Sequence, residues 1–121
     1  MRVRFAGLAE KDVKKILRDT RKKFGPGQVK AYSAIIDRAT AMLADNPDRP
    51  SSLDRSDLFP HVRSFHLSLA AGKRGAAAHK IFYTVQTARN NVQELVILRV
   101  LHDAMEPKRR TIGDFKPDDP R

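Results

Sequence analysis

The side chains best suited to chemistry lie near the C-terminus, in the stretch LVILRVLHDAMEPKRR from Leu95 to Arg110. Arg99 interrupts an apolar run in this stretch, and His102 ends it. An imidazole can act as an acid or a base near neutral pH, and a guanidinium binds carboxylates and phosphates. If the run is a strand, these two side chains point to opposite faces. We therefore do not expect them to act on one phosphate unless the strand is bulged after Arg99.

Each of these two residues also has a structural interpretation. A buried arginine needs a carboxylate, so we expect Arg99 to reach the open face of the sheet and pair with Asp103, Glu94 or a neighbouring acid. The alternative is that Arg99 contacts a partner protein. His102 is expected to cap the strand end or to form a hydrogen bond there, with catalysis as the alternative.

The sequence predicts no metal site and no cofactor. The chain has no cysteine, which excludes disulfides, thiolate metal sites and a cysteine nucleophile. The remaining histidines, His61, His66 and His79, are not spaced as ligands on one helix or loop, so we do not expect zinc.

Positive charge is the strongest compositional signal. The 121 residues contain 24 Lys and Arg against 14 Asp and Glu, a formal net charge of +10. Such a surface attracts polyanions, which include nucleic acid, the ribosome and acidic proteins, although it can also be a plain soluble surface. The chain has neither the run of about 18 apolar residues that spans a membrane nor an apolar signal-peptide core. We expect a single cytoplasmic domain.

The N-terminal part of the chain predicts a short strand and two helices. The strand covers residues 2–5, and the helices cover residues 8–24 and 27–45. The first helix has an apolar stripe at the helical period, formed by Val13, Ile16, Leu17, Thr20 and Phe24. Its opposite face carries Lys11, Lys14, Lys15, Arg18 and Lys22. The short Gly25-Pro26-Gly27 connection favours an antiparallel helical hairpin.

The second half of the chain predicts three strands. After a polar loop over residues 48–60, the strands are expected at 61–69, 79–86 and 94–102, with a small-residue segment at 70–78 between the first two. The last strand is apolar almost throughout, so it is expected to be central. The fold class is therefore α+β, with the short N-terminal strand and the helical hairpin packed on a small antiparallel β-sheet. We expect one domain over residues 1–107 and a basic, flexible tail over 108–121.

Several motifs occur in a characteristic order. They are FG at 24–25, QVKAY at 28–32, MLADNP at 42–47, HKIFYTV at 79–85 and RVLHDAMEPKRR at 99–110. Over residues 3–110 the chain resembles the RelE/ParE superfamily of toxins from type II toxin–antitoxin modules, and within it the ParE-like branch. The most specific element is IFY followed by RVLH-x-x-M-[DE]-P. The segments at 48–60 and 70–78 are longer than in typical members.

The resemblance implies a cytoplasmic bacterial toxin that inhibits DNA gyrase by binding, without catalysis of its own. It also implies a cognate acidic antitoxin that wraps around the toxin and neutralises it, and the ribbon-helix-helix type is one candidate for that antitoxin. A surface of +10 favours association with an acidic segment, and an apolar groove in the hairpin or sheet would add affinity. The residues expected to bind target or antitoxin are Lys11, Lys14, Lys15, Arg18, Lys22, Arg99, Lys108, Arg109 and Arg110.

Two alternatives remain open. RelE-like members of the superfamily are metal-independent, ribosome-dependent endoribonucleases of mRNA, which need a general acid, a general base and several cations at one phosphate. Only Arg63, Lys80 and His102 match that set here. The other alternative is a non-toxic basic module that binds an antitoxin or nucleic acid. If the C-terminal arm contacts the target, truncation after Met105 is expected to weaken toxicity and retain the fold.

Overall fold

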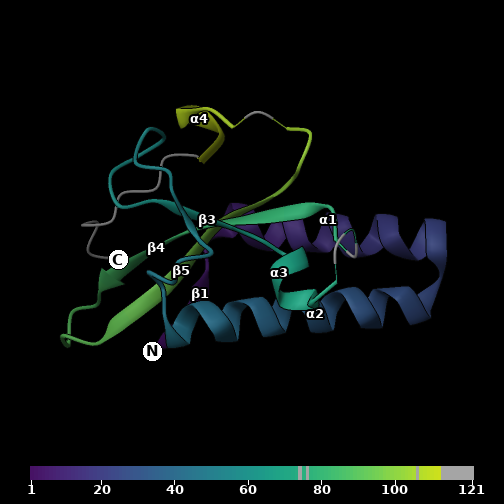
Figure 1. Cartoon of the computed structure of the whole chain (residues 1–121), viewed down its shortest axis with the longest axis horizontal. Coiled ribbons are helices and arrows are strands. Elements are labelled where there is room, and N and C mark those ends of the chain that lie inside the picture. Colours follow the sequence, from purple (N-terminus) through teal and green to yellow (C-terminus); the bar gives the residue numbers. More distant parts are fainter. Residues whose placement is uncertain (74, 76, 106, 113–121) are drawn as a thin grey trace.

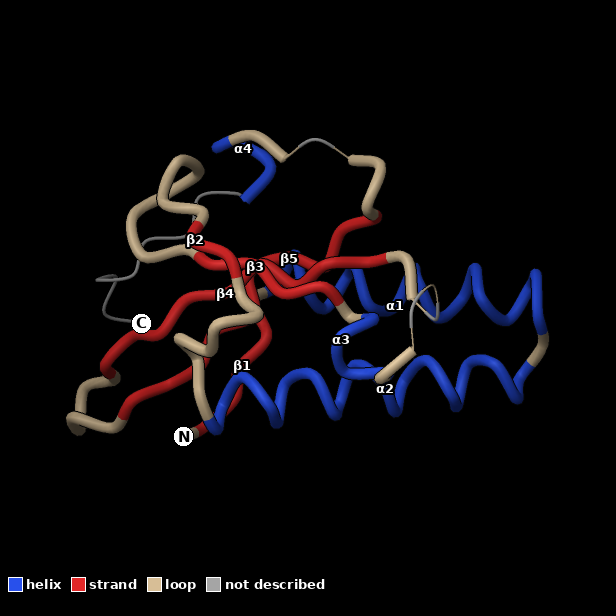
Figure 2. The backbone as a smooth tube through the Cα atoms, viewed as in Figure 1, coloured by secondary structure: helices blue, strands red, loops and turns tan. Residues whose placement is uncertain are grey.

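The computed structural model describes residues 1–73, 75, 77–105 and 107–112, except for the side chain of Arg110. A β-sheet forms the middle of the molecule, and a long helical hairpin covers one of its faces (Figure 1). The hairpin extends beyond the end of the sheet, so its tip stands away from the rest of the chain. The tube view separates the same layers by type of secondary structure (Figure 2). No helix in the described part of the chain is long and apolar enough to cross a membrane.

The hairpin consists of α1 (Gly7–Phe24) and α2 (Pro26–Asp45). Both helices were predicted from periodicity, and their bounds agree with the prediction to within one residue. The connection is tight because Gly25 has φ 86° and ψ 176°, a backbone conformation that other residues rarely adopt. Pro26 then occupies the first turn of α2, where its lack of an N–H has no consequence.

The sheet has five strands in the order β1-β5-β4-β3-β2. Their bounds are β1 Arg2–Phe5, β2 Leu53–Asp54, β3 Arg63–His66, β4 His79–Thr87 and β5 Gln93–His102. β1 runs parallel to β5, and the other neighbours are antiparallel. The predicted α+β class is therefore confirmed, with one parallel strand added to the antiparallel sheet. β5 lies inside the sheet, as its apolar run predicted.

Three local predictions were wrong. The strand expected at 61–69 ends at His66, because Leu67 adopts an αR conformation and starts the short helix α3 (Ser68–Ala71). Leu69 is consequently 46% exposed, whereas Leu67 is buried. The expected loop at 48–60 contains β2, which pairs with β3 through two residues. Phe24 was placed on the buried stripe of α1 but is 70% exposed, because the hairpin is longer than the sheet that it covers.

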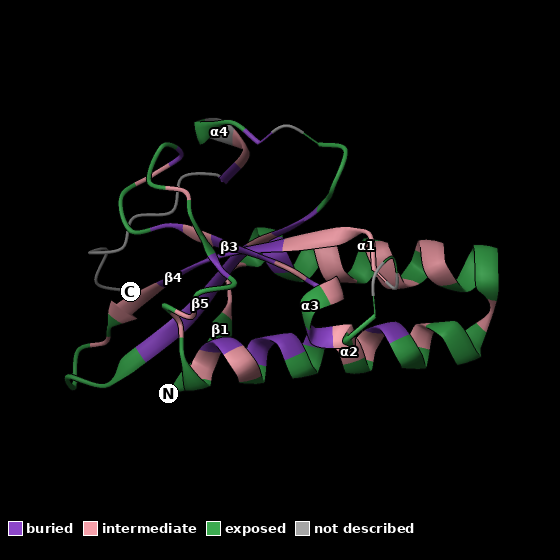
Figure 3. Cartoon of the chain, viewed as in Figure 1, coloured by how far each residue is buried: buried purple, intermediate pink, exposed green. Residues whose placement is uncertain are grey.

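The two faces of the sheet bury separate apolar clusters, and Figure 3 shows buried positions along the strands and the inner side of the hairpin. The larger cluster lies between sheet and hairpin and includes Tyr32, Ile36, Leu43, Phe65, Ile81, Tyr83, Leu95 and Ile97. The smaller cluster lies on the other face and consists of Leu58, Val62, Phe82, Val96, Leu98, Leu101 and Ile112. Because β5 contributes to both clusters, its positions from Leu95 to Leu98 are all buried.

The C-terminal segment continues to pack beyond the boundary predicted at residue 107. Pro107 is buried, and the short helix α4 (Arg109–Ile112) places Ile112 in the smaller cluster with 3% exposure. The start of the predicted tail therefore lies against the sheet. The rest of that tail, residues 113–121, lies outside the described residues.

Candidate functional site

Arg99 is held by an acid on the hairpin. Its Nε donates to Asp12 Oδ2 at 2.7 Å and its Nη2 to Asp12 Oδ1 at 2.9 Å, so the pair is bidentate. Its Nη1 donates to the carbonyl oxygen of Thr111, and Asp12 Oδ2 also accepts the N–H of Val100 at 3.0 Å. The hydrogen bond to Asp12 raises the pKa of Arg99 above its ordinary value. Arg99 thus joins α1, β5 and the C-terminal segment.

The partner of Arg99 differs from the two acids that we named. Glu94 lies near Arg4, 3.6 Å from its Nε, and Asp103 binds His66. Asp12 can reach Arg99 because β1 pairs with β5 only as far as Ile97. Beyond that point the edge of β5 is open, and the first turns of α1 reach it. The predicted need for a carboxylate is met, but by a residue 87 positions away.

A bulge in β5 sets the direction of Arg99. Between Phe82 and Tyr83 the partner on β5 changes from Arg99 to Ile97, which leaves Leu98 as the extra residue. The bulge therefore lies before Arg99 and not after it. Arg99 pairs with Phe82 of the smaller cluster, and His102 pairs with His79 on the hairpin side. The two side chains point to opposite faces, as the alternation predicted.

His102 belongs to a polar network at one end of the sheet. Tyr32 Oη lies 2.6 Å from His79 Nδ1 and accepts the N–H of Ala78 at 3.2 Å. Burial, and then the neighbouring His102, lower the pKa of His79, while burial raises the pKa of Tyr32. Which of the two groups donates in this hydrogen bond depends on the tautomer of His79, because a neutral imidazole donates through one nitrogen and accepts through the other. The ring of His79 meets that of His102 edge to face, with centroids 5.4 Å apart.

His102 is the exposed member of this network. Its Nδ1 accepts the N–H of Ala104 at 3.0 Å, which is the strand-end hydrogen bond that we expected. Nearby, His66 Nε2 lies 2.7 Å from Asp103 Oδ1, and His66 Nδ1 accepts from the Ser68 N–H at 3.1 Å and lies 2.7 Å from the Ser68 hydroxyl. The serine, histidine and aspartate are joined in series. Because Ser68 is only two residues from His66, the arrangement fixes the start of α3.

The three residues of the ribonuclease alternative are not brought together. Arg63 lies opposite Tyr83 on β4, and its guanidinium binds Ser52, with Nε 2.9 Å from Oγ and Nη2 3.2 Å from the carbonyl oxygen. Lys80 pairs with His66 and Leu101, and Leu101 belongs to the face away from the hairpin. His102 pairs with His79, the first residue of β4, four residues along the strand from the partner of Arg63, Tyr83. Among the described residues, no three metal-ligating side chains lie close enough to hold an ion.

The predicted basic residues of α1 do share an exposed face. Lys11, Lys14, Lys15, Arg18 and Lys22 are exposed, and Lys15 forms an ion pair of 3.0 Å with Asp19. Lys108 and Arg109 are also exposed, whereas the side chain of Arg110 lies outside the described residues. Arg99 stands apart from this group because its nitrogens bond within the chain.

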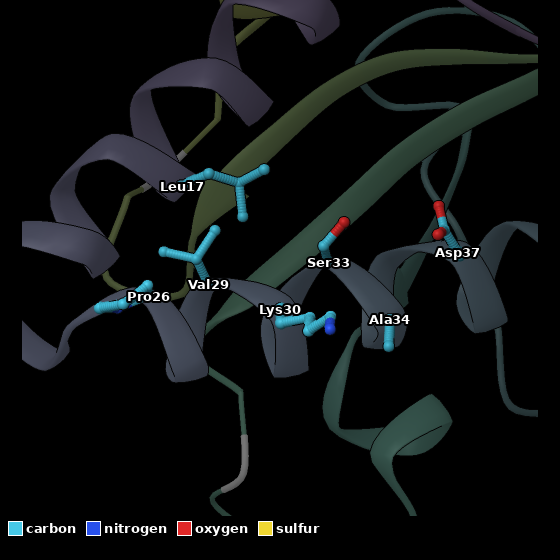
Figure 4. Close-up of a pocket in the computed structure, with 7 residues that line it drawn as sticks. All are labelled: Leu17, Pro26, Val29, Lys30, Ser33, Ala34 and Asp37. Carbon is cyan, nitrogen blue, oxygen red and sulfur yellow. The ribbon is translucent and has the colours of Figure 1, made fainter.

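A shallow groove of about 540 Å³ lies between the two hairpin helices. Figure 4 shows Leu17 of α1 facing Val29 of α2 across it. The other lining residues belong to α2 or its first turn: Pro26, Lys30, Ser33, Ala34 and Asp37. The lining of the groove therefore combines apolar side chains with charged and polar ones.

Sequence reasoning missed Asp12, Tyr32 and His79 as polar partners. Tyr32 is a buried aromatic of the larger cluster, and its hydroxyl reaches His79, 47 residues further along the chain. Asp12 lies near the N-terminus of α1. Its position one helical turn before Ile16, on the side of the apolar stripe, was the one signal that it faces the sheet.

The N-terminal strand, the helical hairpin and the mixed sheet form an α+β architecture consistent with the RelE/ParE-like fold. The sequence profile of the family described as "ParE toxin of type II toxin-antitoxin system, parDE" matches residues 3–107. The chain therefore belongs to the ParE toxin family, and it is the toxin component of a type II toxin–antitoxin system. No curated protein sequence matched the chain.

Proposed function

We propose that this toxin inhibits DNA gyrase by binding it, and that a cognate acidic antitoxin neutralises it. The observation that carries the proposal is the family match over residues 3–107, which extends from the N-terminal strand to the C-terminal segment. Because the proposed target is DNA gyrase, the toxin is proposed to act in the bacterial cytoplasm. The antitoxin is expected to have a ribbon-helix-helix domain followed by an acidic segment.

The arrangement of the cations supports binding rather than chemistry. Cleavage of RNA needs an acid, a base and cations at one phosphate. His102 lies opposite His79 at the start of β4, whereas Arg63 lies opposite Tyr83 in the middle of that strand, and the guanidinium of Arg63 is bound by Ser52. By contrast, the cations of α1 are exposed on one helix face, where they form a continuous surface for a macromolecule.

The same hairpin offers a surface for the antitoxin. An acidic segment could follow the exposed cations of α1, and apolar side chains of an amphipathic helix could enter the groove between Leu17 and Val29. Charge attraction of this kind raises the association rate and weakens with salt. Antitoxin bound here would cover the basic face and so compete with the target.

A paired assay tests the proposal. The purified toxin is added to gyrase with relaxed plasmid, and separately to programmed ribosomes with mRNA, each with and without antitoxin. We expect loss of supercoiling in the first reaction, relief by antitoxin, and intact mRNA in the second. Intact supercoiling activity at a large excess of toxin would contradict gyrase as the target. Lack of effect in both reactions would instead support a non-toxic antitoxin-binding module.

One observation favours ribosome-dependent RNA cleavage as a second candidate. His79 and His102 are in contact at the sheet end, and two imidazoles can supply both an acid and a base. If the mRNA in the ribosome reaction is cut, His102→Ala should abolish cutting, whereas Lys80→Ala on the other face should change it little. Equal cutting by wild type and His102→Ala would exclude this site.

A further inference from the structure

The tip of the helical hairpin combines an exposed aromatic ring with unpaired cations. Phe24 ends α1 and is 70% exposed, the largest fraction among the exposed large apolar side chains in the described part of the chain. Arg21, Lys22 and Lys23 precede it in the last turn of the helix and are also exposed. Figure 1 shows that the tip projects beyond the sheet, so the sheet does not cover it in the described part of the chain.

Charge is concentrated at this tip. Residues 18–30 contain five basic residues and one acid, a net charge of +4 out of the +10 of the chain. The acid is Asp19, and its carboxylate is already bound by Lys15 at 3.0 Å. The side chains of the five cations form no hydrogen bond or ion pair with another described residue; they are Arg18, Arg21, Lys22, Lys23 and Lys30. They are therefore available to an external polyanion.

The tip is also held in one shape. The N–H of Gly25 donates to the carbonyl oxygen of Arg21 at 2.9 Å, and Pro26 fixes the first turn of α2. A short, hydrogen-bonded turn loses little conformational entropy when a ligand binds. A lone exposed phenylalanine is common on protein surfaces. An exposed aromatic ring on a projecting turn, flanked by three cations, matches the combination by which proteins hold single-stranded nucleic acid, through phosphate contacts and base stacking.

We propose that the hairpin tip binds DNA, with Phe24 stacked on an accessible base and Arg21, Lys22 and Lys23 on the adjoining phosphates. The choice of DNA rests on the proposed function, because gyrase holds DNA while it acts. Binding to the tip would let the toxin contact the DNA and the enzyme together. The groove lined by Leu17 and Val29 belongs to the hairpin body and stays open to the antitoxin.

The test measures binding of the full-length chain to fluorescent oligonucleotides by anisotropy, without gyrase, from about 50 to 200 mM salt. Single-stranded DNA is expected to bind more tightly than duplex DNA. Phe24→Ala should weaken binding about fivefold to tenfold without changing the salt dependence, since one stacked base contributes a factor of at least about five. Phe24→Trp should retain binding because indole also stacks.

The contribution of the three cations beside Phe24 is tested through the salt dependence of DNA binding. Replacing Arg21, Lys22 and Lys23 by Gln should reduce the slope of log Kobs against log salt by about two, because each phosphate contact on a single strand contributes about 0.7. Leu53→Ala and Lys73→Ala are the matched controls, an exposed apolar residue and an exposed lysine away from the tip, and should change neither affinity nor slope. Circular dichroism confirms that each variant is folded.

Three results would overturn the inference. One is unchanged DNA affinity of Phe24→Ala, and another is equal weakening by the two control variants. The third is tip-dependent binding to an acidic antitoxin peptide or to anionic vesicles with no binding to DNA. Failure of the proposed function is recognised separately, because it appears as intact supercoiling in the presence of wild-type toxin, whatever the anisotropy shows.

Discussion

Asp12 links three parts of the molecule through one carboxylate. It binds the guanidinium of Arg99 with both oxygens and caps the N–H of Val100 at the open edge of β5. Arg99 in turn holds the carbonyl oxygen of Thr111 in the C-terminal segment. An arginine in the interior of an apolar strand is stable here because each of its donor nitrogens has an acceptor.

Removal of Asp12 should therefore destabilise the fold. In Asp12→Ala the guanidinium of Arg99, whose side chain is only 18% exposed, loses its carboxylate and the Val100 N–H loses its acceptor. We expect the free energy of unfolding to fall by about 2 kcal/mol, measured by urea denaturation. Asp19→Ala breaks the exposed pair with Lys15 and should cost less than about 0.5 kcal/mol. Equal losses in the two variants would contradict this account.

His79 should make stability depend on pH. Burial, followed by the nearby His102, lowers its pKa below the ordinary 6.5, so the unfolded chain binds a proton before the folded chain does. The stability that depends on a neutral His79 is fully present above pH 6.5. It is lost as the pH falls from there through the pKa of His79 in the folded state. His79→Asn keeps an acceptor for Tyr32 and should flatten this decline by up to about 1.4 kcal/mol per pH unit. Unfolding free energies between about pH 7.5 and 5 measure it.

The matched control is the exposed His61, whose positive φ of 66° asparagine tolerates. His61→Asn should leave the pH profile of the wild type unchanged. A profile that is flattened by His61→Asn, and not by His79→Asn, would show that the buried network does not respond to pH as proposed.

At the scale of elements, the C-terminal segment acts as a cover for the second face of the sheet. Ile112 packs with Phe82, Leu98 and Leu101, and Pro107 is buried before it. The expectation that truncation after Met105 leaves the fold intact is therefore revised. Such a truncation removes both the apolar contact of Ile112 and the carbonyl acceptor of Arg99 Nη1 at Thr111, so lost toxicity would not by itself identify a target-binding arm.

A single substitution separates these effects. Ile112→Ala should lower the free energy of unfolding by about 2 kcal/mol or more, because it leaves a cavity in the smaller cluster. Lys108→Ala and Arg109→Ala remove exposed charges and should change stability by less than about 0.5 kcal/mol. If the basic arm contacts the target, these two variants lose gyrase inhibition while remaining stable. Full inhibition by both would exclude the arm from the target interface.

At the scale of the whole molecule, the periodic spacing of apolar residues predicted the helices and strands that bury one face or both. Both helices and the two long strands follow from apolar spacing, and the basic face of α1 follows from residue type. Features set by contacts between distant segments were missed. Asp12 is 87 residues from Arg99, and Tyr32 is 47 residues from His79. Phe24 was wrongly placed in the core because a helical stripe does not reveal where the underlying sheet ends.

The most direct measurement titrates this toxin into a fixed concentration of gyrase and follows supercoiling of relaxed plasmid. A toxin that acts by binding should inhibit in proportion to the toxin-to-gyrase ratio, reach a plateau once gyrase is saturated, and release active gyrase when antitoxin is added. Full supercoiling activity at a large excess of folded toxin would contradict the account. If far less than one toxin molecule per gyrase inactivated the enzyme and antitoxin did not restore its activity, that result would also contradict the account, because it would require catalysis.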